Sequence, residues 1–193
     1  KAMITFRPLT AQEIPLWHAD ELSEAFIPQE RKPLPDILHM IADGRYEVWG
    51  LFDADRLLGY AALWKSNAVP LVLLDYLGVT RSRRSEGLGS RILSYLSAQG
   101  RTLVTEAELP IPDGDPGENA LRQRRIAFYI RNGFVPAYRM ATCGMAWQAL
   151  LLHADAPLPE IMAWHKALYG PKRTDVVVPL PEGELPQLPY WIT

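Results

Sequence analysis

The sequence has one cysteine, no basic excess and no long apolar run, and each absence excludes a class of protein. Cys143 is the single cysteine among 193 residues, so no intramolecular disulfide can form and a reducing, cytoplasmic compartment is expected. The 20 Lys and Arg residues are outnumbered by 22 Asp and Glu, which disfavours a general nucleic-acid binder. No window approaches ~18 consecutive apolar residues, so no membrane span is expected.

Metal chemistry also finds little support in the sequence. The four histidines stand at His18, His39, His153 and His165, and their spacing matches no metal-binding motif. We therefore expect surface histidines, or histidines with satisfied hydrogen bonds, and no metal. Cys143 is expected to be a small buried apolar residue rather than a catalytic thiol.

The apolar pattern predicts an α/β (α+β) protein with a mixed, mostly antiparallel central sheet flanked by helices. Alternating or continuous apolar runs predict strands, and apolar residues at helical spacing predict helices. The predicted strands are 4–7, 46–52, 57–64, 69–79, 101–109, 134–140 and 143–150. The predicted helices are 11–18, 35–43, 87–99 and 118–132, and the first begins with a capping box formed by Thr10 and Glu13.

The composition changes after residue 150. Residues 158–169 are amphipathic, and the following tail is rich in proline. We expect residues 3–150 to form one domain. Residues 151–193 are expected to pack, as a helix and tail, on that domain or on a neighbouring subunit. Within the tail, Val176–Val178 is expected to add a strand to a sheet edge or to a second subunit, which leaves a homodimer open.

The junction between strand 69–79 and helix 87–99 predicts an anion site. It reads LGVTRSRRSEGLGSRI over residues 77–92. The first amides of a helix have no intrahelical partner, and glycine lets a phosphate approach them closely. The amides of Ser85–Ser90 are expected to surround the anion, and Arg84 to add a charge-assisted hydrogen bond. The spacing matches neither a nucleoside-triphosphate loop nor a dinucleotide fingerprint.

Two motifs resemble those of a known family. Residues 84–89 (RSEGLG) match R/Q-x-x-G-x-G/A, the coenzyme-A pyrophosphate signature of the GNAT superfamily of N-acetyltransferases. Residues 125–134 (RIAFYIRNGF) are similar to a later motif of the same superfamily, in compressed spacing. The resemblance spans residues 3–150 and implies the GNAT acyl-CoA N-acyltransferase fold, with acetyl-CoA as co-substrate.

The resemblance also implies which residues bind the cofactor. Main-chain groups of Leu77, Gly78 and Val79 would hold the pantetheine arm in the manner of an added strand. The pyrophosphate would lie on the junction, at Arg84, Ser85, Glu86, Gly87, Leu88, Gly89 and Ser90. Arg124 stands where many family members carry asparagine. It and its basic neighbours would meet the 3′-phosphate or an acidic acceptor, or form a solvated face.

Catalysis in this family implies an acid and a base. Tyr129 would protonate the departing thiolate, since a phenol has a suitable pKa. The alternative for Tyr129 is an ordinary core tyrosine. A carboxylate would take the proton of the acceptor amine. Asp75 and Glu106 are equal candidates and Glu108 is a third, each of them open to a purely structural role.

The implied function is N-acetyl transfer to a primary amine of a small-molecule acceptor by direct attack in a ternary complex. The alternative is a noncatalytic acyl-CoA-binding sensor. A third reading, nucleic-acid binding through Arg81, Arg83 and Arg84, is disfavoured by the net charge. The sequence does not identify the acceptor amine.

Overall fold

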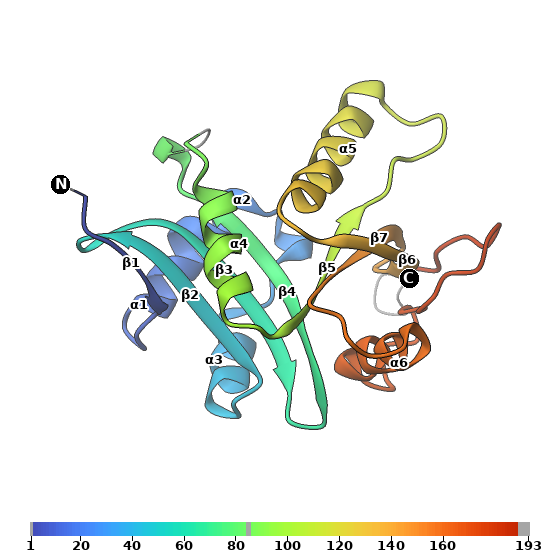
Figure 1. Ribbon diagram of the computed structural model, residues 1–193, viewed down its shortest axis with the longest axis horizontal. Helices are drawn as coiled ribbons and strands as arrows, with labels where there is room; N and C mark the ends of the chain where they lie inside the picture. Colours follow the sequence, from blue (N-terminus) through green and yellow to red (C-terminus); the bar gives the residue numbers. More distant parts are fainter. Residues whose placement is uncertain (1, 84–85, 189–193) are drawn as a thin grey trace. The chain divides into compact units, whose positions relative to one another are not determined.

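The structure, a computed structural model, describes residues 2–83 and 86–188 and confirms the predicted order of helices and strands (Figure 1). The strands are β1 (Ile4–Pro8), β2 (Tyr46–Asp53), β3 (Arg56–Ser66), β4 (Val69–Val79), β5 (Thr102–Glu108), β6 (Val135–Thr142) and β7 (Met145–Leu152). The α-helices are α1 (Glu13–Leu16), α2 (Ser23–Ala25), α3 (Leu34–Ala42), α4 (Leu88–Ala98), α5 (Pro116–Arg131) and α6 (Leu158–Tyr169). The shorter helical segments are the π-helical η1 (Trp17–Leu22) and the 3₁₀ helices η2 (Pro28–Glu30) and η3 (Arg81–Arg83).

The strands form one seven-stranded sheet in the order β1-β2-β3-β4-β5-β7-β6. The pairs β1–β2, β2–β3, β5–β7 and β6–β7 are antiparallel. This confirms the predicted mixed, mostly antiparallel sheet flanked by helices. Over the described residues, no helix combines the length and apolar character needed to cross a bilayer.

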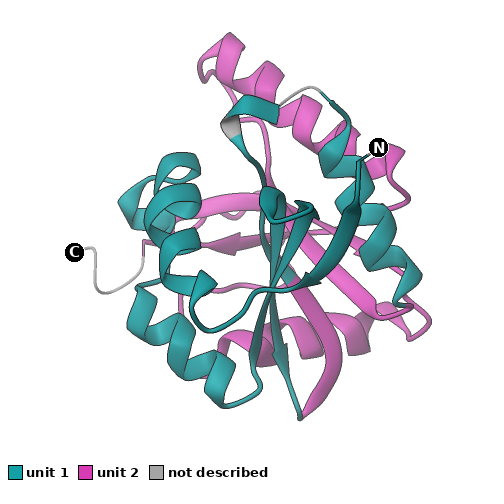
Figure 2. Ribbon diagram, turned by 90° about the vertical axis from the view of Figure 1, so that its left-hand side faces the viewer, with its two compact units in different colours: residues 1–67, 74–99 teal, residues 68–73, 100–193 magenta. Residues whose placement is uncertain are grey.

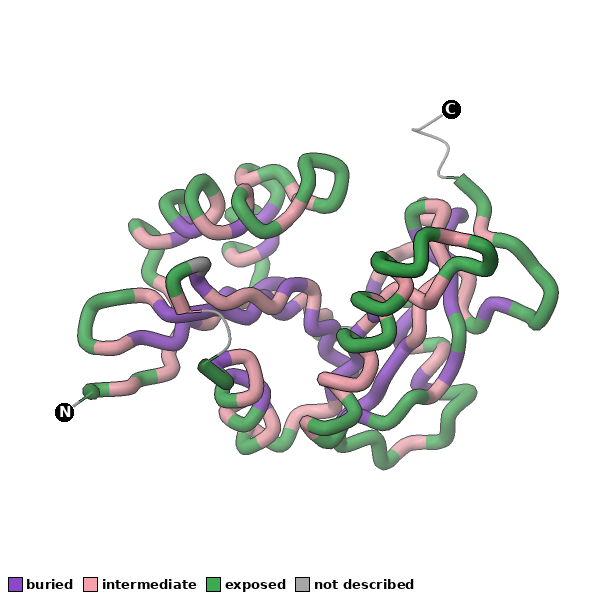
Figure 3. Tube along the Cα trace, turned by 90° about the horizontal axis from the view of Figure 1, so that it is seen from above, coloured by how far each residue is buried: buried purple, intermediate pink, exposed green. Residues whose placement is uncertain are grey.

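The chain divides into two compact units (Figure 2). Unit 1 contains residues 1–67 and 74–99, and unit 2 contains residues 68–73 and 100–193. In both units the buried residues lie on the strands and on several of the helices (Figure 3). Helix α5 has no residue that is buried as a whole.

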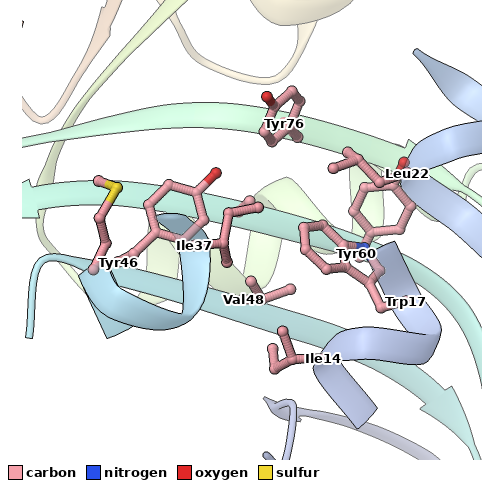
Figure 4. Close-up of a cluster of buried hydrophobic side chains, with 10 residues drawn as sticks. Ile14, Trp17, Leu22, Ile37, Tyr46, Val48, Tyr60 and Tyr76 are labelled. Carbon is pink, nitrogen blue, oxygen red and sulfur yellow. The ribbon is translucent and has the colours of Figure 1, made fainter. Parts of the chain in front are cut away.

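In unit 1, helices pack on both faces of the strands. One face carries an apolar cluster contributed by α1, η1, α3 and the strands β2–β4 (Figure 4). The buried members are Ile14, Trp17, Leu22, Ile37, Met40, Tyr46, Val48, Tyr60, Ala62 and Tyr76. On the opposite face, Ile92 of α4 lies so close to Gly59 that a Cβ there would be 2.8 Å from its Cδ1. The two faces follow from the alternation of side chains along β3.

The first helical region has the predicted capping box, begins at Glu13 rather than at residue 11, and extends past its predicted end. The Thr10 amide donates to Glu13 Oε1 at 2.7 Å and the Glu13 amide donates to Thr10 Oγ1 at 3.3 Å, as a capping box requires. The helix continues to Ala25 because η1 follows α1. The i→i+5 bonding of a π-helix brings residues five apart onto one face, and here those residues are Trp17 and Leu22, both buried.

In unit 2, strands β5, β7 and β6 carry α6 on one face. Glu106, Ala149 and Tyr138 are cross-strand neighbours, and His165 of α6 contacts both Glu106 and Tyr138. The tail then returns to the outer strand: the amides of Val177 and Ala141 each donate to the other's carbonyl at 3.0 Å. The tail therefore adds to the β6 edge of its own sheet, which is one of the two placements expected for Val176–Val178.

Two local predictions were wrong. Helix α5 begins at Pro116 rather than residue 118, because the Asp115 carboxylate caps it by accepting from the Glu118 amide at 2.8 Å. Cys143 is exposed rather than buried. It occupies the turn between β6 and β7 with a φ of 53°, so its side chain lies outside the core.

Candidate functional site

The strand-to-helix junction in unit 1 has the predicted form. Helix α4 begins at Leu88 behind Gly87, which adopts a left-handed conformation with φ 74° and ψ 14°. Because the N-cap residue is a glycine, it contributes no side chain to cap the first amides, which belong to Leu88, Gly89 and Ser90. Arg84 and Ser85, which the sequence also places at this site, lie outside the described residues. Glu86 is exposed and lies 3.4 Å from Arg83.

The last residues of β4 have the exposure that a strand-like ligand would need. Leu77, Gly78 and Val79 are all partly exposed, whereas Leu71–Leu74 are buried. Gly78 also has a structural reason to lack a side chain, because a Cβ at this position would lie 2.3 Å from the Tyr60 ring. The glycine is thus required by packing whether or not a pantetheine arm lies beside it.

Asp75, on the same strand, is held by a cation and a phenol. Lys32 Nζ donates to Asp75 Oδ2 at 2.8 Å, and the Tyr46 hydroxyl donates to the same oxygen at 2.6 Å. Burial, with the nearby Asp75 charge, raises the pKa of Tyr46 well above its usual range, so this phenol remains a donor at neutral pH. The carboxylate predicted as a base therefore faces an alkylammonium group.

Glu106, on β5 in unit 2, is held by two side chains of α6, Tyr169 and His165. Tyr169 donates to Oε1 and Oε2 at 2.7 and 2.8 Å, and His165 Nε2 lies 2.7 Å from Oε2. The other ring nitrogen of the buried His165 lies 2.8 Å from the Tyr138 hydroxyl. His165 is thus buried with both nitrogens satisfied, one of the two states expected of the histidines. Glu108 is paired with Arg122 Nε at 2.9 Å.

Tyr129 lies on α5 with its phenol end against β5. Its ring makes edge contacts with Phe128 and Phe134, and its hydroxyl hydrogen-bonds with the Thr105 side chain. Burial of the phenol raises the pKa of Tyr129, and the Thr105 hydrogen bond and the Arg125 charge offset part of that rise. Arg124, on the same helix, is exposed.

Tyr129 and Glu106 lie on opposite faces of the unit 2 sheet. Thr105 and Glu106 are consecutive on β5, so their side chains point to opposite faces. Thr105 contacts Tyr129 of α5, whereas Glu106 contacts His165 and Tyr169 of α6. Asp75, the third predicted catalytic residue, belongs to unit 1.

The partners of both carboxylates lie too far along the chain to be predicted from the sequence. Lys32 is 43 residues from Asp75, and His165 is 59 residues from Glu106. The one local signal was on α6, where His165 occupies the apolar face between Ile161 and Leu168, a position that a histidine takes when it has a buried partner. Across the described residues, His, Cys, Asp and Glu form no group of three that could hold a metal ion.

Comparisons with known proteins identify the family and agree with the fold. The acetyltransferase (GNAT) family model matches residues 14–134. A search of curated proteins finds no match. Among solved structures, a protein assigned to the GNAT family from Bacteroides thetaiotaomicron is 25% identical, with a TM-score of 0.65 over 87% of this chain and 99% of that one.

Two more distant structures share the fold. A variant of the spermidine N-acetyltransferase from Vibrio cholerae is 12% identical, with a TM-score of 0.58 over 77% of this chain and 92% of that one. A GNAT acetyltransferase from Elizabethkingia anophelis, with acetyl-CoA bound, is 13% identical, with a TM-score of 0.53 over 80% of this chain and 100% of that one. Since the family model matches more than half of the chain, the protein belongs to the GNAT family of acetyltransferases and is an acyltransferase.

Proposed function

We propose that the protein is an N-acetyltransferase that moves an acetyl group from acetyl-CoA to a primary amine of a small-molecule acceptor. The amine attacks the thioester directly in a ternary complex. The observation that carries the proposal is the start of α4, where Gly87 leaves the first amides uncapped immediately after the partly exposed end of β4. An anionic cofactor with an extended arm fits these two features together.

Acetyl-CoA is the proposed co-substrate. Its pyrophosphate would accept hydrogen bonds from amides of Glu86–Ser90, with Arg84 and Ser85 completing the loop. Its pantetheine arm would pair with main-chain groups of Leu77–Val79. Arg124 is exposed on α5 and is the proposed contact for the 3′-phosphate. A bound acetyl-CoA in the Elizabethkingia anophelis structure supports this choice of cofactor.

The proposed chemistry needs a base and an acid. The acceptor enters as an ammonium ion and first loses a proton to a carboxylate. The neutral nitrogen then forms a bond to the thioester carbon, the carbon–sulfur bond breaks, and the nitrogen loses its second proton to water as the amide forms. Tyr129 then donates its proton to the departing thiolate. The phenol is protonated at neutral pH and can therefore donate, while its raised pKa makes Tyr129 a weaker acid than a free tyrosine.

The contacts favour Asp75 over Glu106 as the base. Asp75 already binds an alkylammonium group, which is the form of the acceptor before it loses its proton. Glu106 accepts hydrogen bonds from Tyr169 and contacts His165, and it lies on the opposite sheet face from Tyr129. We therefore propose Asp75 as the base and assign Glu106 to anchoring α6.

The test is release of coenzyme-A thiol from acetyl-CoA in the presence of a panel of primary amines. We expect release that depends on both acetyl-CoA and an amine, with no acetylated protein formed in amine-free reactions. Tight acetyl-CoA binding without release for any amine would instead support the noncatalytic sensor. Absence of acetyl-CoA binding in calorimetry would contradict both functions.

A further inference from the structure

Lys32 places its ammonium group in a site built for a cation. Its Nζ lies 2.8 Å from Asp75 Oδ2, and the Tyr46 hydroxyl donates to that same oxygen at 2.6 Å. The side chains of Lys32 and Asp75 are 24% and 13% exposed, so the pair is largely withdrawn from water but still reached by it. A carboxylate in such surroundings is costly without a cation.

Aromatic faces complete this site. Lys32 Nζ lies 4.4 Å from the Trp64 ring centroid, 5.7 Å from that of Tyr76 and 6.0 Å from that of Tyr46. Cations within about 6 Å of an aromatic face are attracted by its quadrupole. We call the set Tyr46, Trp64, Asp75 and Tyr76 the ammonium cage, since one carboxylate and three aromatic rings recognise an alkylammonium ion.

The main chain of Lys32 is held by contacts that do not involve its ammonium group. The Lys32 amide donates to the Tyr76 hydroxyl at 2.9 Å, and the Lys32 carbonyl lies 2.8 Å from His18 Nε2. These two bonds fix the main chain independently of the ammonium group. Rotation of the four-carbon stem is enough to empty the cage, and such rotamer changes are fast for a partly exposed side chain.

The cage lies on β4, the strand along which the proposed cofactor would run. Under the proposed function, the phosphates lie at the start of α4 and the pantetheine arm runs back along Val79, Gly78 and Leu77. Asp75 is two residues further in that direction, or about 7 Å along a strand. The reactive end of the cofactor would therefore point toward the cage.

We propose that the ammonium cage is the binding site of the acceptor amine, and that Lys32 occupies it whenever the acceptor is absent. The inference rests on the proposed function. It names the acceptor class as primary alkylamines with an unbranched stem, which enter as the ammonium ion. Amines with an adjacent carboxylate are excluded, because Asp75 would repel that charge. Lys32 acts as a tethered competitor that the acceptor must displace.

The experiment measures binding rather than turnover, with n-butylammonium as the probe and no acetyl-CoA present. Calorimetry compares the unmodified chain, Lys32→Met and the control Lys65→Met, which removes a lysine that pairs with Glu47 outside the cage. Removal of a competitor tethered at an effective concentration in the millimolar range should tighten binding by about tenfold or more. We expect this gain in Lys32→Met and none in Lys65→Met. Neutral n-butanol and zwitterionic norleucine should bind none of the three proteins.

A second measurement uses the unmodified chain, so the result does not depend on the folding of Lys32→Met. In protein labelled at the lysine Cε carbon, n-butylammonium should shift the Lys32 resonance and leave that of Lys65 in place. Equal affinity of Lys32→Met and the unmodified chain, or an unmoved Lys32 resonance at saturating probe, overturns the inference. A third outcome separates the two proposals. If acetyl-CoA does not bind the unmodified chain but n-butylammonium gives both expected results, the proposed function is contradicted and the ammonium cage stands as an amine-binding site.

Discussion

At the scale of single residues, two carboxylates that look alike in the sequence have different partners in the structure. Asp75 meets the charged Lys32, whereas Glu106 meets the phenol of Tyr169 and the imidazole of His165. A cation held by a flexible stem can be exchanged for another cation. A carboxylate tied by two side chains of a packed helix cannot release them without disturbing that helix. This difference is why we propose Asp75 for catalysis.

Tyr129→Phe tests the proposed acid. We expect turnover to fall by about 10²-fold, because the thiolate then departs without a positioned proton donor, while affinity for acetyl-CoA stays unchanged. Steady-state thiol release and calorimetry measure the two quantities. Tyr95→Phe is the matched control, since this tyrosine stacks on Phe6 at 5.1 Å and has no proposed role. Turnover of Tyr129→Phe within threefold of the unmodified chain would exclude the phenol as the acid.

Glu13 gives a prediction about stability and pH. Hydrogen bonds from the Arg7 guanidinium, with help from the Thr10 amide, lower the pKa of Glu13 to about 2 from its usual value of 4.5. A carboxylate with a depressed pKa stabilises the fold above its unfolded pKa and loses that contribution as the pH falls through its folded pKa.

Glu13→Gln should therefore lower the free energy of unfolding by about 0.5–1 kcal/mol at pH 7, a modest value because the Arg7–Glu13 pair is partly exposed. The difference should shrink below pH 4.5 and vanish only below about pH 2, as urea unfolding at several pH values would show. A difference that keeps its full pH 7 value at pH 2 would mean that the ionised carboxylate is not its source.

At the scale of elements, α4 and α6 differ in how they relate to the candidate site. Helix α4 presents its uncapped start to the proposed cofactor, and its register is set by apolar residues that the sequence shows directly. Helix α6 lies outside the part that the family model matches, yet it supplies both partners of Glu106. The two helices show that a motif predicts the position of a site better than it predicts the contacts that support the site.

Gly87→Ala tests the start of α4, and Gly44→Ala is its matched control. Both glycines have positive φ, 74° and 72°, and an added Cβ would meet no atom within 4 Å in either place. Each substitution should cost about 1 kcal/mol of stability from backbone strain alone. Gly87→Ala should in addition weaken acetyl-CoA binding by about tenfold or more, because the methyl group would stand where the phosphate approaches. Equal acetyl-CoA affinities in the two variants would contradict the proposal that the pyrophosphate binds at this junction.

At the scale of the whole molecule, acetyl-CoA should raise the thermal unfolding midpoint. A ligand at 100 times its dissociation constant stabilises the folded chain by about 2.7 kcal/mol. For a chain of this length that corresponds to about 5–10 °C. Thermal unfolding with and without acetyl-CoA measures the shift, with S-acetylpantetheine as the control because it lacks the pyrophosphate. An equal shift with both ligands would contradict the anion site.

The sequence by itself determined the helices and strands, and it predicted where the candidate site lies. Apolar periodicity, the Thr10–Glu13 capping box and glycines at helix ends act within a few residues, so they can be read along the chain. The β2–β3 hairpin, the extent of α6 and the helix that follows the glycine-rich junction were predicted on those grounds and confirmed. The start of α5 was misplaced because the cap at Asp115 was overlooked.

Only the tertiary structure decided which groups surround the site residues. The ammonium of Lys32 on Asp75, the imidazole of His165 beside Glu106 and the tail on β6 all join positions far apart in the sequence. No local pattern encodes such pairs, because each depends on how the whole chain closes around its core. The sequence therefore identified the candidate carboxylates, and the fold showed that Asp75 faces the ammonium group of Lys32 whereas Glu106 faces His165 and Tyr169.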